Sequence, residues 1–264
     1  MQVTFLGTGT SQGVPMIGCA CDVCRSSDPA DKRFRASIVV TQDDGMQVLV
    51  DTTPDLRSQA LACNLSRVDA VVYTHSHADH IFGLDELRRF IALRGGGTMT
   101  VHGDAHTIAE LRRIFGYAFS SPAELGGGVP RLVPEVVSAP FAIGGTDWVP
   151  VPIVHGRRPI HGYRIGSFAY LTDCSHVPDE SWALLEGLEV LVIGALRERA
   201  HPTHFSLPEA VAAAQRIGAR QTLFTHMCHD LGHAATNARL PEGMALAYDG
   251  LSVTLPATRP GASA

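Results

Sequence analysis

The segment at residues 75–80, HSHADH, places four side chains that can bind metal within six positions. It directly follows an apolar run that predicts a buried strand. In extended backbone, His75 and His77 point to the same side and can share one ion. As the chain turns into the next predicted helix, Asp79 and His80 can face a second ion. Imidazole and carboxylate ligands suit zinc, and also manganese or iron.

Three cysteines form a second group, with Cys19, Cys21 and Cys24 spaced as C-x-C-x₂-C. In a reduced compartment, these thiolates are a plausible part of a closed tetrahedral zinc site that needs a fourth ligand. His229 offers that ligand, and Cys228 beside it is the rival. The alternative is a set of buried or redox-active thiols without metal.

His204 lies just before a predicted helix at 207–217, and His201 precedes it by three residues. A histidine at such a junction can act as a general acid if it faces the metals, because an alkoxide leaving group needs a proton. The alternative for His204 is an exposed residue of a capping loop, and His201 has the weaker claim. Arg157 and Arg158 could hold a phosphate, or form an exposed pair.

Two aspartates could orient metal-binding histidines through the second ring nitrogen, as metal sites usually require. Asp51 closes a predicted strand near the ligands, and Asp249 precedes the last predicted strand. Both are expected to act through hydrogen bonds, outside the ligand set.

The 75–80 segment resembles the signature of the metallo-β-lactamase superfamily. That pattern requires a further His, Asp and His in this order, each at the end of a strand. His155, Asp173 and His226 match these three positions. The resemblance implies an α/β fold, a four-layer αββα sandwich of two mixed sheets flanked by helices. It also implies two active-site ions, zinc or manganese. The first would be held by His75, His77 and His155, the second by Asp79, His80 and His226, with Asp173 bridging both.

Within the superfamily, the chain is similar to the phosphoribosyl 1,2-cyclic phosphate phosphodiesterases, the PhnP-like family. The similarity rests on the segment Gly13-Val14-Pro15, the C-x-C-x₂-C loop and a T-H-x-x-H segment. It implies a structural zinc held by the cysteines and His229, and it makes His204 the additional active-site histidine. Asp79, Asp173 and His204 are the residues expected to take part in catalysis.

Two adjacent divalent ions can lower the pKa of a bridging water and stabilise charge on a phosphoryl oxygen. We therefore expect a metal-dependent phosphodiesterase that acts on a small cyclic phosphate. The alternatives are a ribonuclease Z-like nuclease, a lactonase or a thioesterase, because the fold alone does not decide the substrate. A zinc-binding protein without catalysis is the alternative outside enzymes.

These residues must be positioned by interleaved strands and helices. Strands are predicted near residues 3–6, 36–41, 46–51, 69–74, 98–102, 132–137, 147–154, 162–166, 168–172, 190–193, 221–225 and 251–255. Helices are predicted near 55–63, 83–94, 106–115, 178–186 and 207–217. No internal repeat or linker is evident, so we expect one domain over 1–255 and a disordered tail at 256–264.

Composition narrows the expected partners. The chain has 264 residues and a net charge of −5, which argues against binding of nucleic acid through overall positive charge. It has no apolar run of the roughly 18–20 residues that span a bilayer and no recognisable signal peptide, so we expect a cytoplasmic protein with reduced cysteines. The expected partner is a small phosphodiester substrate, and we expect no association with a membrane. The sequence leaves open whether the protein forms a homodimer.

Overall fold

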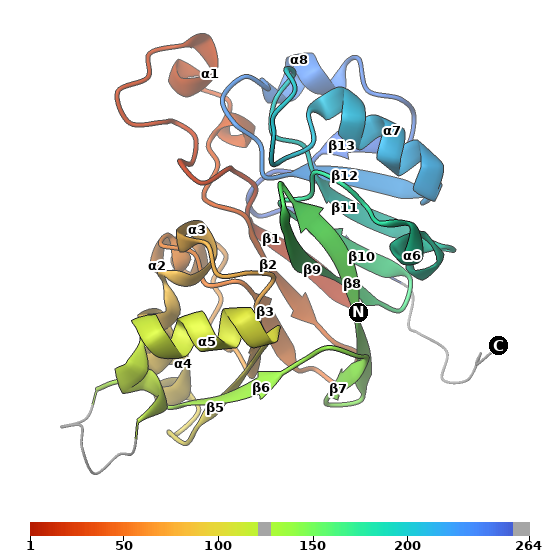
Figure 1. Cartoon of the computed structure of the whole chain (residues 1–264). Coiled ribbons are helices and arrows are strands. Elements are labelled where there is room, and N and C mark those ends of the chain that lie inside the picture. The colour runs from red at the N-terminus through yellow and green to blue at the C-terminus, as the bar shows by residue number, and fades with distance from the viewer. Residues whose placement is uncertain (121–127, 256–264) are drawn as a thin grey trace.

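Two seven-stranded sheets form the middle of the molecule, and helices cover the outer face of each (Figure 1). The structure is a computed structural model that describes residues 1–120 and 128–255. The tail predicted to be disordered, 256–264, lies outside the described residues. The arrangement confirms the predicted four-layer αββα sandwich.

The first sheet has the strand order β14-β1-β2-β3-β4-β5-β6. Its strands are β1 (Gln2–Gly7), β2 (Ser37–Thr41), β3 (Gln47–Val50), β4 (Ala70–Val72), β5 (Met99–Gly103), β6 (Leu132–Val136) and β14 (Ser252–Thr254). Strands β14, β1, β2 and β3 pair antiparallel, whereas β3 to β6 pair parallel.

The second sheet has the order β13-β12-β11-β10-β9-β8-β7. Its strands are β7 (Phe141–Ile143), β8 (Thr146–His155), β9 (Arg158–Ile165), β10 (Phe168–Leu171), β11 (Val190–Gly194), β12 (Gln221–Thr225) and β13 (Met244–Leu246). Strands β7 to β10 pair antiparallel and β10 to β13 pair parallel. The two sheets thus share one pattern of pairing, although the sequence shows no repeat.

Eight α-helices lie among the described residues, and most connect parallel strands. They are α1 (Asp22–Arg25), α2 (Leu56–Ala62), α3 (Ala78–Ile81), α4 (Leu87–Leu93), α5 (Ala105–Ile114), α6 (Asp179–Trp182), α7 (Leu207–Ile217) and α8 (His233–Asn237). Helix α7 shows why the boundaries fall where they do. Ser206 and Glu209 form a capping box at its start, and Gly218 ends it with a φ of 71°. None of the described helices has the length and apolar character needed to cross a membrane.

Three separate hydrophobic cores hold the four layers together. Phe5, Trp148 and Phe168 belong to the core between the sheets. A second core packs helix α7 against the outer face of the second sheet, and a third packs α4 and α5 against the first. Each sheet is therefore covered on both faces, which is why its parallel strands are almost continuously apolar.

The predicted helix over 83–94 is divided in the structure. A short 3₁₀ helix spans Leu84–Glu86, and α4 follows it. Gly83 lies so close to the chain near Thr53 that a Cβ would meet the Thr53 carbonyl oxygen at 1.9 Å. This close approach fixes the segment that follows α3, the helix that carries Asp79 and His80.

The edge strands β7 and β13 and the short helices α1, α3 and α8 were not predicted from the sequence. Each of the two strands has only three residues, and the three helices have four or five. Such segments are too short to show a hydrophobic period, so pairing and packing with neighbouring segments determine them.

Candidate metal centre and the adjoining pocket

The predicted active-site ligands lie at or just beyond the carboxyl ends of four strands. His75 follows β4 by three residues, and His155 is the last residue of β8. Asp173 lies two residues beyond β10, and His226 directly follows β12. Helix α3 adds Asp79 and His80, and His77 directly precedes the helix. The structure thus brings all seven predicted residues to one edge of the two sheets, in two groups that share Asp173.

The first group contains His75, His77, His155 and Asp173, and all its ligand atoms lie within 4.8 Å of one another. The Nε2 atom of His155 is 3.3 Å from Nδ1 of His77. The Oδ2 atom of Asp173 lies 3.8 Å from His75 Nε2 and 4.0 Å from His155 Nε2. These atoms surround a space large enough for one ion.

The second group contains Asp79, His80, Asp173 and His226, within the same limit of 4.8 Å. Here the other carboxylate oxygen of Asp173, Oδ1, lies 3.3 Å from Nε2 of both His80 and His226. Asp79 Oδ2 is 3.3 Å from His80 Nε2 and 3.5 Å from His226 Nε2. Asp173 therefore turns one oxygen toward each group, as a bridging ligand would.

Buried nitrogen atoms without partners show that the two groups fit metal ions. Nε2 of His75 and Nε2 of His80 are buried and have no hydrogen-bond partner among the described residues, although each faces several other polar groups. Burying such an atom unpaired is costly. A divalent cation among imidazole and carboxylate ligands would satisfy both atoms.

The pKa shifts of the residues in the two groups also indicate that the site favours positive charge. Burial alone would raise the pKa of Asp173, but His226 and His80 outweigh burial and hold it well below its usual range. Burial lowers the pKa of His75, and the nearby His80 lowers it further. For His80, three carboxylates outweigh burial and raise the pKa well above normal. The carboxylates thus favour positive charge at this position.

Hydrogen bonds to the second ring nitrogen fix several of the histidines. His80 donates from Nδ1 to the buried carboxylate of Asp51 at 2.7 Å, and Asp51 also accepts from the backbone and hydroxyl of Thr74. His155 donates from Nδ1 to the Thr203 carbonyl at 2.6 Å. These contacts turn Nε2 of His80 and His155 toward the groups. Asp51 thus makes the expected hydrogen bond to the second ring nitrogen of a candidate ligand.

Asp249 does not have the expected role. Its carboxylate accepts from the Thr8 hydroxyl at 2.7 Å and from the Phe34 backbone at 2.6 Å, and among the described residues it forms no hydrogen bond with a histidine. It instead ties the loop after β1 to neighbouring chain segments. The sequence placed Asp249 at a turn but could not show which element that turn would pack against.

Three residues at the site have left-handed backbone. Asp51, Asp173 and His226 have φ angles of 64°, 56° and 57°. Residues other than glycine rarely adopt this conformation, which costs roughly 1–3 kcal/mol each. All three lie just beyond a strand end, where the reversal turns the side chain toward the metal groups.

The three cysteines of the N-terminal loop meet His229. Its Nδ1 atom lies 3.1 Å from the sulfur of Cys19, 3.4 Å from that of Cys21 and 3.6 Å from that of Cys24. Helix α1 begins directly after Cys21, and a hydrogen bond from the Cys24 backbone is the main cause that lowers the Cys21 pKa to about 7. Cys228 is outside the group, and its sulfur accepts from the Asp230 backbone at 3.3 Å.

His204 lies against both metal groups. Its Nδ1 atom is 3.9 Å from Asp173 Oδ2, and its ring stacks on His226 at a centroid distance of 4.9 Å. Burial, together with His226, lowers the pKa of His204 to about 3, although Asp173 opposes this. Burial and the neighbouring imidazole thus disfavour a proton on His204.

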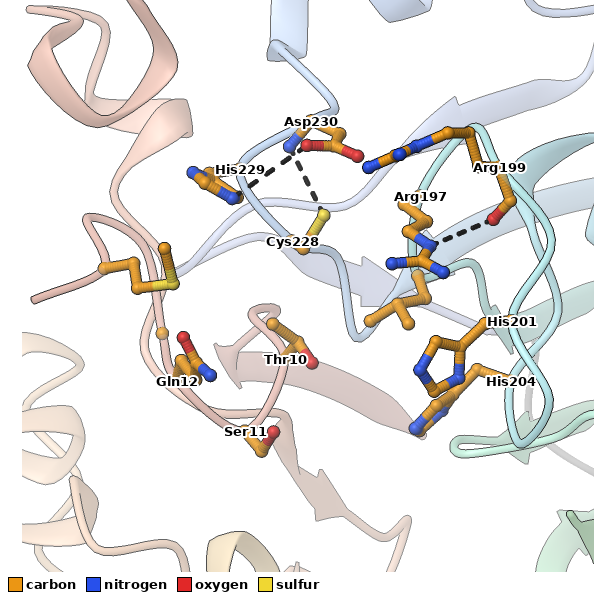
Figure 2. Close-up of a pocket in the computed structure, with 13 residues that line it drawn as sticks. Thr10, Ser11, Gln12, Arg197, Arg199, His201, His204, Cys228, His229 and Asp230 are labelled. Carbon is orange, nitrogen blue, oxygen red and sulfur yellow. Dashed lines mark hydrogen bonds and ion pairs between the residues drawn. The ribbon is translucent and has the colours of Figure 1, made fainter. Parts of the chain in front are cut away.

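A pocket of about 280 Å³ begins at His204 and extends toward His229 (Figure 2). Thr10, Ser11 and Gln12 line one side of it. The loop after β11 lines the other side with polar and basic side chains, namely Arg197, Arg199, His201 and His204.

The basic residues of the pocket differ from those singled out in the sequence. Arg157 and Arg158 are exposed, and neither lines this pocket. Arg197 and Arg199 do line it, although they were not predicted from the sequence. Their position shortly before His201 and His204 was the available signal.

Comparison with known proteins agrees with this geometry. The family model described as a β-lactamase superfamily domain matches residues 46–227. A crystal structure described as a new diphosphatase from the PhnP family aligns with a TM-score of 0.90 and 44% identity, covering 97% of this chain and 98% of the other.

Two curated relatives carry other names. An octanoyltransferase of Porphyromonas gingivalis is 35% identical over 97% of this chain, which spans only 52% of that longer protein. The coenzyme PQQ synthesis protein B of Rhodopseudomonas palustris is 25% identical over 97% of this chain and 100% of its own length. The matched family domain, the PhnP-family structure and the two ligand groups agree: the chain belongs to the metallo-β-lactamase superfamily of hydrolases and, within it, to the PhnP family.

Proposed function

We propose that this protein is a dinuclear metal-dependent phosphodiesterase that hydrolyses a small cyclic phosphodiester such as phosphoribosyl 1,2-cyclic phosphate. The observation that carries the proposal is the carboxylate of Asp173, which turns one oxygen to each ligand group. A shared carboxylate holds two ions close together, and such pairs serve phosphoryl transfer by clamping the attacking and leaving oxygens.

Seven residues would hold the two ions, zinc or manganese. They are His75, His77 and His155 for the first, Asp79, His80 and His226 for the second, and Asp173 for both. When bound, such ions would lower the pKa of water and stabilise negative charge on the phosphoryl oxygens. The chain itself keeps the ligands oriented through Asp51 and the Thr203 carbonyl. Asp79 and Asp173 help to place the reacting groups, and His204 is positioned to give a proton to the leaving oxygen.

The pocket favours a small polar substrate over the alternatives. Among its lining residues only Met16 and Leu196 are large and apolar, which suits a phosphate ester better than an octanoyl chain. A net charge of −5 does not favour tRNA as substrate. Octanoyl transfer is the name of a relative about twice as long, and we do not assign it to this chain.

Hydrolysis of bis(p-nitrophenyl) phosphate tests the proposal. The protein should be active with added zinc or manganese, lose activity and active-site metal on chelation, and regain both when metal is restored. Metal content measured on the same samples separates an empty site from an inactive one. A panel of ribose and nucleotide cyclic phosphates would then identify the substrate. Inactivity of the fully metallated protein toward every phosphodiester would instead favour a zinc-binding protein.

We also propose that Cys19, Cys21, Cys24 and His229 hold a structural zinc ion. Three thiolates and one imidazole complete a tetrahedral shell with no open position, so this ion would not take part in the chemistry. It would tie the loop after β1 to the segment that carries His226, three residues before His229. Fixing His229 constrains where His226 can place its ring.

Replacing Cys21 with serine should lower both metal content and stability. We expect about three ions per chain in the parent, one for each ligand group, and at least one fewer in the variant. The melting temperature should fall because metal binding is coupled to folding. Both proteins are to be purified without chelator and compared by elemental analysis and thermal unfolding.

The matched control is Cys228→Ser, because Cys228 is a neighbouring thiol outside the group. It should keep the metal content of the parent. A parent with at most two ions, and a Cys21→Ser variant with the same content and melting temperature, would show that the cysteines hold no zinc.

A further inference from the structure

A buried arginine, Arg33, lies between the two parts of the chain that supply the proposed structural zinc site. The three cysteines come from the loop at residues 19–24, whereas His229 lies near the other end of the chain. Arg33 is only 2% exposed. Burying a guanidinium is costly unless its N–H groups find acceptors. The acceptors of Arg33 therefore show which segments it holds in place.

The guanidinium of Arg33 binds the turn that carries His229. Its Nη1 atom donates to the Cys228 carbonyl at 2.9 Å, and its Nη2 atom donates to the Leu231 carbonyl at 2.5 Å. The backbone of Leu231 also donates to the Cys228 carbonyl at 3.5 Å, which closes the turn. The two carbonyls flank His229 in the chain, and one planar cation binds both of them. Arg33 therefore fixes the backbone from which the His229 ring projects.

A buried carboxylate pairs with Arg33 and extends the contact to helix α8. Oδ1 of Asp31 lies 3.4 Å from Nη2 of Arg33. The same oxygen accepts from the backbone of His233 at 2.8 Å, at the first residue of α8. The charge of Arg33 is thus paired in the interior. Together, Asp31 and Arg33 bind the segment that carries His229 at residues 228, 231 and 233.

The residues around Arg33 also bind the loop that carries the cysteines. Lys32 donates from Nζ to the Cys24 carbonyl at 3.0 Å. The backbone of Arg33 exchanges two hydrogen bonds with Val14, which lies shortly before the first cysteine: Arg33 donates at 2.7 Å and accepts at 2.9 Å. Residues 31–33 therefore contact both sides of the proposed zinc site, through hydrogen bonds that need no metal.

We infer that Arg33 is a positioning residue for the proposed zinc site: it holds His229 in place beside the three cysteines before an ion binds. This role rests on the proposed function, because it requires that the four residues hold zinc. Ligands that are already ordered lose less conformational entropy when the ion binds, so a preorganised site has the higher affinity. Arg33 itself contacts no ion and takes no part in the hydrolysis.

Chelator competition on the cobalt-loaded protein tests this role. Thiolate ligands give cobalt(II) a visible absorption that histidine and carboxylate ligands do not give, so the signal reports the cysteine site separately from the two active-site groups. Nitrilotriacetate is added until half of this absorption is lost. Arg33→Met removes the hydrogen bonds to the turn and should lower the required chelator concentration by about 10–100-fold, the typical effect of losing a group that orients a metal ligand. Circular dichroism shows that the variant is folded.

A conservative variant, Arg33→Lys, decides the question if Arg33→Met does not fold. Lysine keeps the positive charge opposite Asp31, but an ammonium group cannot reproduce the planar fork that binds two carbonyls. It should weaken cobalt binding by a smaller factor. The matched control is Arg164→Met, because Arg164 of β9 also donates to two backbone carbonyls, those of Gly166 and Leu184. This control should lose thermal stability but keep the parental affinity for cobalt.

Two outcomes would overturn the role of Arg33 and leave the zinc site intact. One is a parental chelator midpoint in the folded Arg33 variants. The other is an equal shift in Arg164→Met, which would show that the loss of affinity follows from general destabilisation. A parent protein without thiolate–cobalt absorption would instead overturn the zinc site, and the role of Arg33 with it. Hydrolysis of bis(p-nitrophenyl) phosphate tests the dinuclear centre separately.

Discussion

Replacing Asp173 with alanine should reduce kcat/KM for phosphodiester hydrolysis by about 10³-fold or more. Asp173 is the one residue shared by both ligand groups, and its loss leaves three ligands in each. Bound metal ions contribute several kcal/mol of transition-state stabilisation, and about 4 kcal/mol corresponds to about 10³ in rate. The measurement is steady-state hydrolysis of bis(p-nitrophenyl) phosphate with metal resupplied, together with metal content.

A second variant, Asp173→Asn, distinguishes the effect of losing the charge and the bridge from the effect of changing the shape of the side chain. The amide has nearly the same size, but only one of its two atoms can accept, so it can face only one group. It should therefore be nearly as impaired as the alanine variant. Asp147→Ala removes an exposed aspartate from the opposite end of β8 and should retain activity. Near-normal turnover in Asp173→Ala with both ions bound would contradict the bridging assignment.

Replacing His204 with alanine should lower kcat while both active-site ions remain bound. General acid catalysis typically contributes about 10²–10⁴-fold, so the loss should be of that size for an alkyl leaving group. It should be much smaller for p-nitrophenolate, which leaves without a proton. The measurement is the dependence of kcat on the leaving-group pKa across a series of diesters, in parent and variant.

The control for His204 is His106→Ala, which removes an exposed histidine from α5. It should follow the parental dependence on the leaving group. An equal loss for good and poor leaving groups in His204→Ala would mean that His204 only positions the substrate. A loss of metal from that variant would make His204 part of the ligand set.

The local spacing of ligands made much of this site predictable. His75, His77, Asp79 and His80 lie in one short segment, so a strand followed by a turn is enough to bring them together. The more distant ligands could be proposed because a carboxyl-terminal strand end precedes each, and the family resemblance supplied their order. The fold class followed from the same resemblance and from the alternation of strands and helices.

The pocket was less predictable because its walls come from distant loops. Arg157 and Arg158 follow His155 closely, yet Arg157 lies in the turn between β8 and β9, Arg158 begins β9, and neither lines the pocket. Arg197 and Arg199 reach it because hydrogen bonds within their own loop hold the loop in place. No periodicity in the sequence reports such contacts. The partner of Asp249 was unpredictable for the same reason.

The left-handed backbone at Asp51, Asp173 and His226 implies a trade-off between activity and thermodynamic stability. Glycine adopts this conformation without strain, so random mutation offers each position a substitution that relaxes the backbone. Each such change would remove a side chain from the metal centre or its support. Selection for a stable fold alone would therefore erode the site, whereas selection for turnover retains the strain. In this chain, positive φ at non-glycine strand ends thus coincides with the positions that the proposed chemistry needs.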